Sequence, residues 1–327
     1  MLIKRKKTWE RPEREVTPEE IYLKRRDFVK MMGVAGVGAG LLTNGIDIFD
    51  LFGKKDDEKL IKIPETPTSH LYPAKKNAKY TVDRKITDEL VAARYNNFYE
   101  FSSFKSVWKH VDEMEVRPWQ VEVGGLVERP RVYDIDELVR EMPLEERLYR
   151  FRCVEAWAMT VPWTGFPMSA LIKKVSPLSS AKYIRMRTFH NKKWALQQKL
   201  RFWLPWPYEE GLTMEEAMNE LTFLATGIYG HELPKQHGAP VRLVVPWKYG
   251  FKNIKSIVRI DFVEDEPKTF WNTLVPDEYD FTANVNPEVP HPRWSQATER
   301  IIDTDERVPT IKYNGYGEFV ARMYGKR

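Results

Sequence analysis

The sequence predicts an α+β fold in which β-strands dominate and form mixed sheets. Several stretches alternate apolar and polar residues with a period of two, the helices signalled by N-caps are short, and Pro- and Gly-rich loops separate these elements. Of the 327 residues, 42% are hydrophobic and 13% are aromatic, which is a globular composition and excludes disordered, collagen-like and coiled-coil chains. The chain has no internal repeat, so solenoids and propellers are excluded as well.

Residues 1–45 are predicted to be an export signal. Arg25 and Arg26 resemble the paired arginines of the twin-arginine signal, and the uncharged, Gly-rich stretch 31–42 follows them. That stretch is too short to span a bilayer, which needs roughly 20 apolar residues. The signal predicts delivery by the twin-arginine export machinery to the periplasm, with the segment either cleaved or kept as a membrane tether. The alternative, an ordinary amphipathic helix, is disfavoured by the clustered glycines.

Residues 46–79 are polar, charged and rich in turn residues, so they are predicted to be a linker or N-terminal extension. The folded domain is expected to cover residues 80–327. The net charge of +5 lies mostly in the leader, because the first 30 residues carry ten basic and six acidic side chains. The rest of the chain is close to neutral, which argues against binding to nucleic acid.

Within the domain, five stretches are predicted to be strands, because they alternate apolar and polar residues or form short apolar runs between turn residues. A sixth strand is expected near the C-terminus. These predicted strands are 121–127 with a turn or bulge at Gly124 and Gly125, 149–153, 182–188, 241–245, 256–263 and 317–323. The predicted helices are 134–142 with Asp134 as N-cap, 167–174, and one opened by a capping box of Thr213 and Glu216. Loops are expected to prevail after Trp271.

Cys153, the only cysteine, lies at the end of a predicted strand. A buried structural thiol, a reactive nucleophile and a metal ligand are all open on residue type alone. No His or Asn completes a recognisable nucleophile signature, and the chain has no paired cysteines or His-x-x-x-His for zinc. It also lacks a GxGxxG or GxxxxGK[ST] loop, so dinucleotide and NTP binding are not indicated.

Closely spaced cations mark the loop between the last two internal strands. Lys252 and Lys255 lie there with turn N–H groups, after Arg242 in the preceding strand, and such a set can hold a phosphate. A solvated surface loop is the alternative.

Several motifs, in order, resemble the sulfite-oxidase-type molybdopterin family from about Tyr95 to the C-terminus. They are residues 94–100 (RYNNFYE), 152–157 (RCVEAW), 162–167 (PWTGFP), 238–242 (GAPVR), 245–252 (VPWKYGFK) and 292–300 (PRWSQATER). The resemblance implies the family's β-dominated molybdopterin-binding fold for residues 80–327.

The resemblance also implies a cofactor of one molybdenum and one molybdopterin. Cys153 is then the metal ligand and the catalytic residue, and a soft thiolate suits this metal. Carried over motif by motif, the pterin and its phosphate would be held by Asn96, Tyr99, Glu100, Thr188, His237, Arg242, Asn253, Ile254 and Lys255. His237 stands where some relatives are expected to have Asn, and imidazole can still donate one hydrogen bond.

Within the family, the resemblance favours a reductase that repairs methionine sulfoxide residues in oxidised periplasmic proteins. It implies electrons from the respiratory quinone pool through a haem-containing membrane subunit, because this chain has no CxxCH motif of its own. A sulfite dehydrogenase on the same fold and a secreted, non-enzymatic interaction protein are the alternatives.

Overall fold

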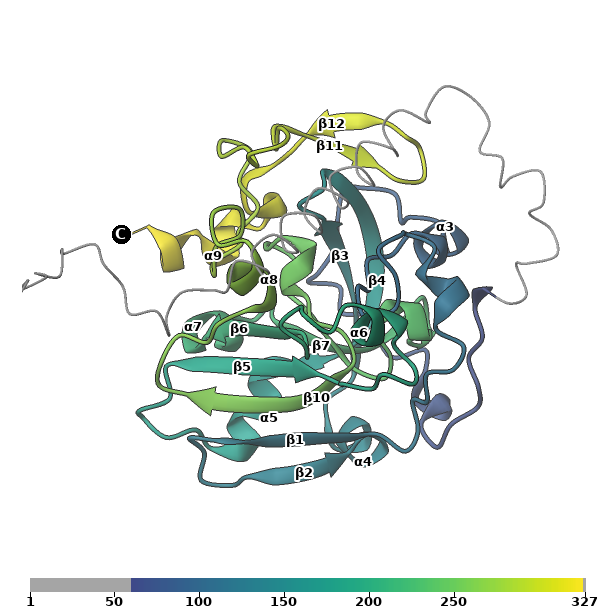
Figure 1. Ribbon diagram of the computed structural model, residues 1–327, viewed down its shortest axis with the longest axis vertical. Helices are drawn as coiled ribbons and strands as arrows, with labels where there is room; N and C mark the ends of the chain where they lie inside the picture. The colour runs from purple at the N-terminus through teal and green to yellow at the C-terminus, as the bar shows by residue number, and fades with distance from the viewer. Residues whose placement is uncertain (1–59, 326–327) are drawn as a thin grey trace, which may run out of the picture. The chain divides into compact units, whose positions relative to one another are not determined.

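The computed structural model describes residues 60–325, so the predicted export signal lies outside the described residues. Two mixed β-sheets with short helices around them make up this part of the chain (Figure 1). The α+β, β-dominated prediction is therefore confirmed. No helix in this part is long and apolar enough to cross a lipid bilayer.

One sheet has five strands within the described residues. They are β1 (Gln120–Gly125), β2 (Arg131–Asp134), β5 (Tyr183–Thr188), β6 (Glu209–Thr213) and β10 (Ile257–Val263). Their order is β2-β1-β10-β5-β6, and only β1 and β10 run parallel to each other. Figure 1 shows β1, β2, β5 and β10 stacked across its lower half.

The other sheet has seven strands. They are β3 (Glu145–Arg152), β4 (Trp157–Pro167), β7 (Phe223–Ile228), β8 (His231–Glu232), β9 (Arg242–Val244), β11 (Thr298–Ile301) and β12 (Arg307–Pro309). The path is β12-β11-β4-β7-β8, with β3 paired to β4 and β9 paired to β7. Every residue of β4 except Pro167 is buried, so this strand forms the centre of the sheet.

The helices are short. The α-helices are α3 (Glu89–Arg94), α4 (Ile135–Glu141), α5 (Met168–Val175), α6 (Leu196–Leu200), α7 (Met214–Met218), α8 (Phe270–Leu274) and α9 (Gly317–Tyr324), and the 3-10 helices are η3 (Ser69–Leu71), η4 (Val107–His110), η5 (Lys235–His237), η6 (Gly250–Lys252) and η7 (Lys312–Gly315). Asp134 accepts from two N–H groups at the start of α4. Thr213 and Glu216 form the predicted capping box, with both reciprocal bonds at 3.1 Å.

The strand predicted near residues 317–323 is wrong, because that segment forms α9. Tyr316, Val320 and Tyr324 follow one another at four-residue spacing, which places them on one helical face, and Val320 is fully buried. The C-terminal third also holds more regular structure than the predicted loops, namely α8, β11 and β12.

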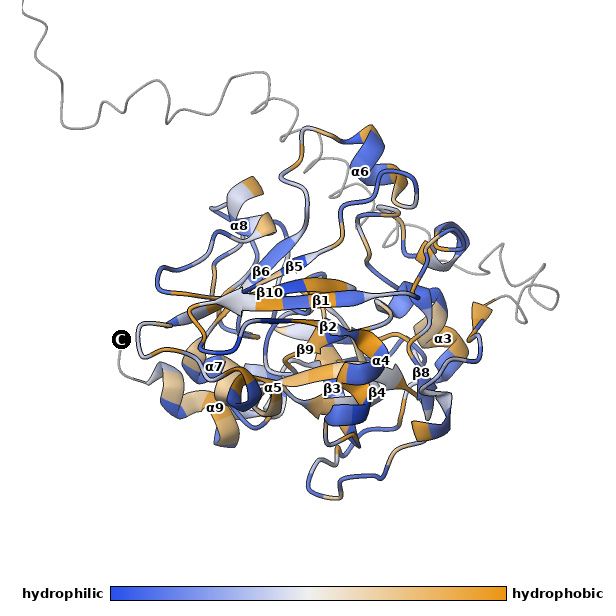
Figure 2. Ribbon diagram, turned by 90° about the horizontal axis from the view of Figure 1, so that it is seen from below, coloured by the Kyte–Doolittle hydropathy of each residue, from blue (hydrophilic) through white to orange (hydrophobic). Residues whose placement is uncertain are grey.

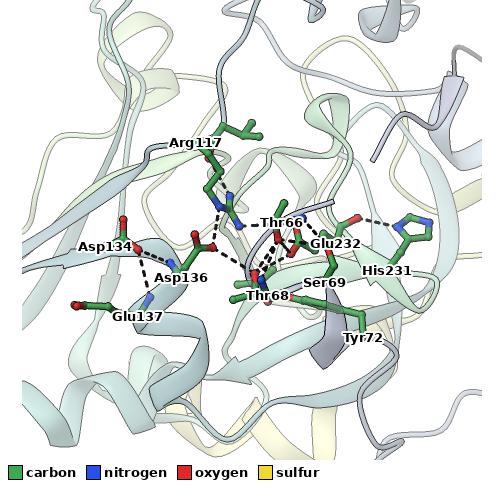
Figure 3. A network of polar contacts seen from close by, with 12 residues as sticks. Thr66, Thr68, Ser69, Tyr72, Arg117, Asp134, Asp136, Glu137, His231 and Glu232 are labelled. Atoms are coloured by element: carbon green, nitrogen blue, oxygen red, sulfur yellow. Dashed lines mark hydrogen bonds and ion pairs between the residues drawn. The ribbon is translucent and has the colours of Figure 1, made fainter. Parts of the chain in front are cut away.

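Polar contacts attach residues 60–79, predicted as a linker, to the rest of the domain. The Thr68 hydroxyl donates to Glu232 (2.8 Å). Arg117 lies between the Asp136 carboxylate (2.8 Å) and that of Glu232 (3.7 Å), and Figure 3 shows these side chains converging. Thr68 is therefore attached to β8 through Glu232 and to α4 through Asp136, which accepts from the Thr68 hydroxyl at 3.3 Å.

Large aromatic side chains fill the interior. Trp163, Trp247 and Trp271 are among the largest fully buried residues, and each buried apolar side chain of this kind contributes roughly 1.5–3 kcal/mol or more to stability. Trp163 comes from β4, and Trp247 comes from the loop after β9, where its Nε1 donates to the Tyr324 hydroxyl of α9 (3.0 Å).

Candidate cofactor site

Cys153 lies in the tight turn that joins β3 to β4. Its N–H donates to the Trp157 carbonyl (2.9 Å), and the Ala156 N–H donates back to the Cys153 carbonyl (3.0 Å). Ala156 adopts a φ of 64°, which lets the chain reverse within four residues. The thiol is 4% exposed and forms no disulfide. The predicted strand thus ends one residue earlier than expected, and Cys153 is a turn residue.

The buried side chain of the neighbouring Arg152 supports this turn. The apolar–polar alternation of the predicted strand 149–153 favoured a solvent-facing arginine, but Arg152 is fully buried. Its guanidinium pairs with Glu299 (2.9 Å) and donates to Gln296 (3.0 Å) and Thr310 (3.2 Å). A buried arginine is tolerated because these groups and the Cys153 carbonyl satisfy its donors.

Three polar side chains that the sequence analysis did not single out surround the thiol. Asn97 Nδ2 lies 3.5 Å from Cys153 Sγ, and a Glu155 carboxylate oxygen lies 3.7 Å from it. Lys105 Nζ donates to Asn97 Oδ1 (2.6 Å) and forms an ion pair with Glu155. Asn97 and Glu155 are part of the quoted motifs 94–100 and 152–157, which is the signal that could have identified them.

The protonation states follow from burial and from these partners. Burial, reinforced by the Glu155 charge, raises the pKa of the Cys153 thiol to about 12. Burial also tends to raise the pKa of Glu155, but the Lys105 charge and hydrogen bonds bring it down to about 2. The thiol is therefore neutral at physiological pH and a poor nucleophile, and a bound metal cation would be needed to stabilise the thiolate.

Residues of the YNNFYE motif lie beside this turn. Asn96 is buried, and its amide donates to the Ala92 and Ala93 carbonyls at the end of α3. Burial raises the pKa of Tyr99 well above its usual range, so its hydroxyl stays protonated. Burial raises the pKa of Glu100 to about 7, although the positive charge of Lys255 opposes this.

A second group of side chains carries cationic or hydrogen-bond-donating nitrogens that pair with no carboxylate within residues 60–325. The group consists of His237, Arg242 and Lys255. Arg242 is 2% exposed and donates to backbone carbonyls of His237 (2.8 Å) and Asn253 (3.3 Å). Burial lowers the pKa of Arg242 to about 9. Burial, with the Arg242 charge, lowers the pKa of Lys255 to about 7 and that of His237 to about 3. Each of these groups would be stabilised by an anion.

Within residues 60–325, Lys255 Nζ forms no hydrogen bond or ion pair, and neither does the His237 ring. The backbone N–H of Lys255 also donates to no group in that range. Gly238, whose φ is 94°, lies directly against the Lys255 stem, where an added Cβ would come within 2.6 Å. Lys255 is therefore held in place with no hydrogen bond or ion pair of its own among the described residues, although the Glu100 charge acts on it, and its ammonium is available to an anion.

The turn 253–255 is built by its own side chains. Asn253 Oδ1 accepts from the Val245 N–H (2.6 Å), and the Ile254 N–H donates to the Lys252 carbonyl (3.1 Å). Thr188, at the end of β5, donates through its hydroxyl to the Ser256 carbonyl (3.0 Å), one residue beyond the turn. The predicted residues 188 and 253–255 are thus brought together, with the turn oriented by Asn253.

Lys252 does not belong to the anion site, although the sequence grouped it with Arg242 and Lys255. It is fully buried, pairs with Glu210 (3.1 Å) and donates to the Phe281 carbonyl. Lys248, in the same loop, is likewise neutralised by Glu216. These two lysines hold the loop in place.

The thiol and the anion site are adjacent. A Cβ added at Gly250 would lie 3.5 Å from the Cys153 Cα and 2.6 Å from the Phe151 ring. Cys153 is also among the groups whose charge would act on the pKa of Lys255. A soft sulfur ligand beside a set of anion-seeking donors fits a metal-bearing cofactor with a phosphate group, so the residues present match molybdopterin chemistry.

Comparisons with known proteins agree with this chemistry. A family model described as the oxidoreductase molybdopterin binding domain matches residues 108–271. The protein-methionine-sulfoxide reductase catalytic subunit MsrP of Burkholderia mallei is 45% identical over 318 residues, covering 96% of this chain and 92% of the relative. Among solved structures, the sulfane dehydrogenase SoxCD from Paracoccus pantotrophus overlaps 68% of this chain and 60% of its own, at 16% identity and a TM-score of 0.41.

Proposed function

Because this chain belongs to the molybdopterin-binding oxidoreductases, in the family of protein-methionine-sulfoxide reductase catalytic subunits, we propose that it reduces methionine sulfoxide residues of proteins to methionine. The reaction consumes two electrons and two protons per sulfoxide and releases the thioether and water. The observation that carries this proposal is the buried Cys153 thiol together with the nitrogens of His237, Arg242 and Lys255, none of which pairs with a carboxylate within residues 60–325.

Cys153 would be the protein ligand of a single molybdenum, and the bound cofactor would supply the two-electron redox chemistry. Arg242, the Lys255 ammonium and the Lys255 N–H would hold the phosphate of the pterin. The remaining pterin contacts would come from Asn96, Tyr99, Glu100, Thr188, His237, Asn253 and Ile254. His237 stays neutral because of its depressed pKa, so it would donate a single hydrogen bond.

The chain's own groups near the thiol divide the proton chemistry between them. Glu155, with a pKa near 2, is ionised and accepts hydrogen bonds from Asn97, Lys105 and Trp157. It is therefore a fixed negative charge, and it does not supply the protons of the reaction. Tyr99 retains its hydroxyl proton, which makes it a donor available to a bound polar ligand.

The electron donor and the cellular compartment of the enzyme are part of the same proposal. Electrons would come from the quinone pool through a haem-containing membrane subunit, since the chain contains no haem-attachment motif. Export by the twin-arginine route would place the folded holoenzyme in the periplasm, where oxidised proteins are its substrates. The paired Arg25 and Arg26 are the feature that supports this route.

The test is to replace the ligand and to measure metal and activity together. Cys153→Ala should remove molybdenum and abolish methionine sulfoxide reduction, while the fold persists because only one small side chain is lost, at a cost of about 1 kcal/mol. Elemental mass spectrometry, an assay with reduced dye as electron donor, and circular dichroism give the three readouts. Tyr183→Phe, on a strand remote from the turn, serves as a control that should change none of them.

Two outcomes would contradict the proposal. Retained molybdenum and turnover in Cys153→Ala would remove Cys153 from the metal site. A wild-type holoenzyme that oxidises sulfite but leaves methionine sulfoxide unreduced would keep the cofactor assignment and reject the substrate.

A further inference from the structure

A long excursion, residues 189–207, leaves the five-stranded sheet between β5 and β6. Its ends meet where the Thr188 N–H donates to the Tyr208 carbonyl (3.1 Å), so it leaves and re-enters the sheet at one point. It carries α6, three tryptophans and four cationic residues, and no acidic residue. Figure 2 shows α6 at the top of the view, beyond the strands, with hydrophobic and hydrophilic residues next to each other.

The inner side of the excursion is fixed. Gln198 is fully buried, accepts from the Asn191 N–H (2.8 Å) and donates to the Phe189 carbonyl (2.9 Å). The Gln197 N–H donates to the Glu100 carbonyl (3.0 Å), which attaches α6 to the YNNFYE motif. The excursion is therefore a packed element with a defined outer face.

That outer face exposes large apolar side chains. Phe202 is 68% exposed, Leu200 54% and Leu196 49%, and Phe104 on the neighbouring segment 101–110 is 68% exposed. Arg201 reaches Ser103 (3.4 Å), which places the two segments side by side. Other exposed apolar residues of the described chain, such as Val132 and Val289, stand apart in sequence and carry no such grouping, as is normal for a soluble surface.

Cations surround these apolar side chains. Lys192, Lys193 and Lys199 of the excursion and Lys109 of the neighbouring segment are exposed, and neither 101–110 nor 189–207 contains an acidic residue. The face therefore combines apolar side chains that water disfavours with charges that attract an anionic surface.

We propose that the 189–207 excursion, together with Phe104, docks this protein onto an anionic phospholipid surface. Exposed Phe and Leu side chains insert at the boundary between head groups and acyl chains, and half-buried Trp194, Trp203 and Trp206 suit the same boundary. Lysines beside them attract anionic head groups. An acidic protein surface would satisfy the lysines but not the cluster of protruding apolar side chains, so lipid matches both features. The proposal does not depend on the reductase reaction.

The test is vesicle binding by the full-length holoenzyme, measured by co-sedimentation. Vesicles are either pure phosphatidylcholine or equal parts phosphatidylcholine and phosphatidylglycerol. The variants are Leu200→Ser with Phe202→Ser, and Lys192→Gln with Lys193→Gln and Lys199→Gln. Val132→Ser with Val289→Ser is the matched control, because it removes exposed apolar residues from other surfaces. All the proteins keep the same N-terminal segment, so any contribution from that segment cancels in the comparison.

The expected result is that wild type and the control bind the anionic vesicles alike, whereas each excursion variant binds about tenfold more weakly. Added salt should weaken wild-type binding because it screens the lysines. Turnover of free methionine sulfoxide should be the same in all the proteins, so failure of this proposal is distinguishable from failure of the proposed reaction.

Equal binding by wild type and both excursion variants, or no wild-type binding to anionic vesicles, would overturn the proposal. If vesicle binding is unaffected but the excursion variants raise KM for an oxidised protein and not for free methionine sulfoxide, the face belongs to protein substrates and the lipid assignment is wrong.

Discussion

Residues 242–255 contain two pairs of cationic side chains with opposite surroundings. Lys248 and Lys252 are fully buried, and each lies beside a glutamate, Glu216 or Glu210. Arg242 is equally buried, yet it donates to backbone carbonyls, and the half-buried Lys255 forms no ion pair within residues 60–325, although the Glu100 charge acts on it. The first pair is neutralised by the protein, and the second is left for a ligand.

The difference teaches that burial alone does not mark a binding cation. A buried charge with a carboxylate partner is part of the structure, because its desolvation is offset within the chain. A buried charge without one lowers the stability of the ligand-free protein, and only an anion removes that cost. The pKa directions of Arg242 and Lys248 agree with this, since burial alone lowers the pKa of Arg242, while the Glu216 charge opposes the effect of burial at Lys248.

The largest expected effect comes from breaking a neutralised pair. Glu216→Gln keeps the shape and the capping box but leaves Lys248 buried beside an uncharged group, which should lower the free energy of unfolding by about 3–5 kcal/mol. Urea denaturation of the cofactor-free protein measures it. The control, Glu288→Gln, removes the exposed partner of Lys312 and should leave the unfolding free energy unchanged within error, because solvent screens that pair. Equal losses of unfolding free energy in the two variants would show that burial does not make the Lys248–Glu216 pair more important for stability than the exposed Lys312–Glu288 pair.

Removing Arg242, a buried cation with no carboxylate partner within residues 60–325, should affect pterin binding strongly and stability little. Arg242→Gln should leave the unfolding free energy of the cofactor-free protein within about 1 kcal/mol of wild type, or raise it, because a costly buried charge is lost. Retention of the pterin should weaken about a hundredfold, since the phosphate loses a desolvated partner. Denaturation and pterin content after dialysis give the two readouts.

Arg187→Gln is a suitable control, because Arg187 pairs with Glu209 at the surface and should affect neither quantity. If Arg242→Gln instead destabilises the protein strongly and retains its pterin, Arg242 is a structural cation like Lys248 and the comparison fails.

The smallest expected effect is a pH dependence at His237. Its native pKa is near 3 and its ordinary value is 6.5, so below pH 6.5 the unfolded chain binds a proton that the native chain does not. Stability contributed by the neutral ring is thus complete above about pH 6.5 and is lost as the pH falls towards 3. Between pH 7 and pH 5, wild type should lose about 2 kcal/mol more than His237→Gln.

Denaturant titrations of the cofactor-free proteins at the two pH values measure this difference. Parallel losses in wild type and His237→Gln would mean that His237 is not held neutral by its surroundings.

Local signals in the sequence were enough for much of the fold and part of the site. The alternation of residues 182–188 and the capping box at Thr213 act within a few residues, so both were predicted correctly. The resemblance to a family singled out Cys153 and Arg242, and the structure shows both of them buried. Their roles toward the cofactor remain proposals.

The rest depends on contacts between distant residues. Lys252 looked like Lys255 in the sequence, and only the fold brings Glu210 from β6 to neutralise it. The position of Lys105 at Glu155 joins segments 50 residues apart. The segment now seen as α9 was misjudged because its apolar residues satisfy a strand period locally, whereas the packing of Val320 selects the helix.

The support of the Cys153 turn has a consequence for how such a site can be inherited. Arg152 is held by Glu299 and Gln296 near the C-terminus, and Asn97 reaches the thiol from the N-terminal side. A fragment limited to the matched residues 108–271 would keep the ligand but lose all three of these partners. The site therefore cannot be transferred as a short contiguous segment, as a metal-binding loop can. Recombination can exchange it only by exchanging nearly the whole domain.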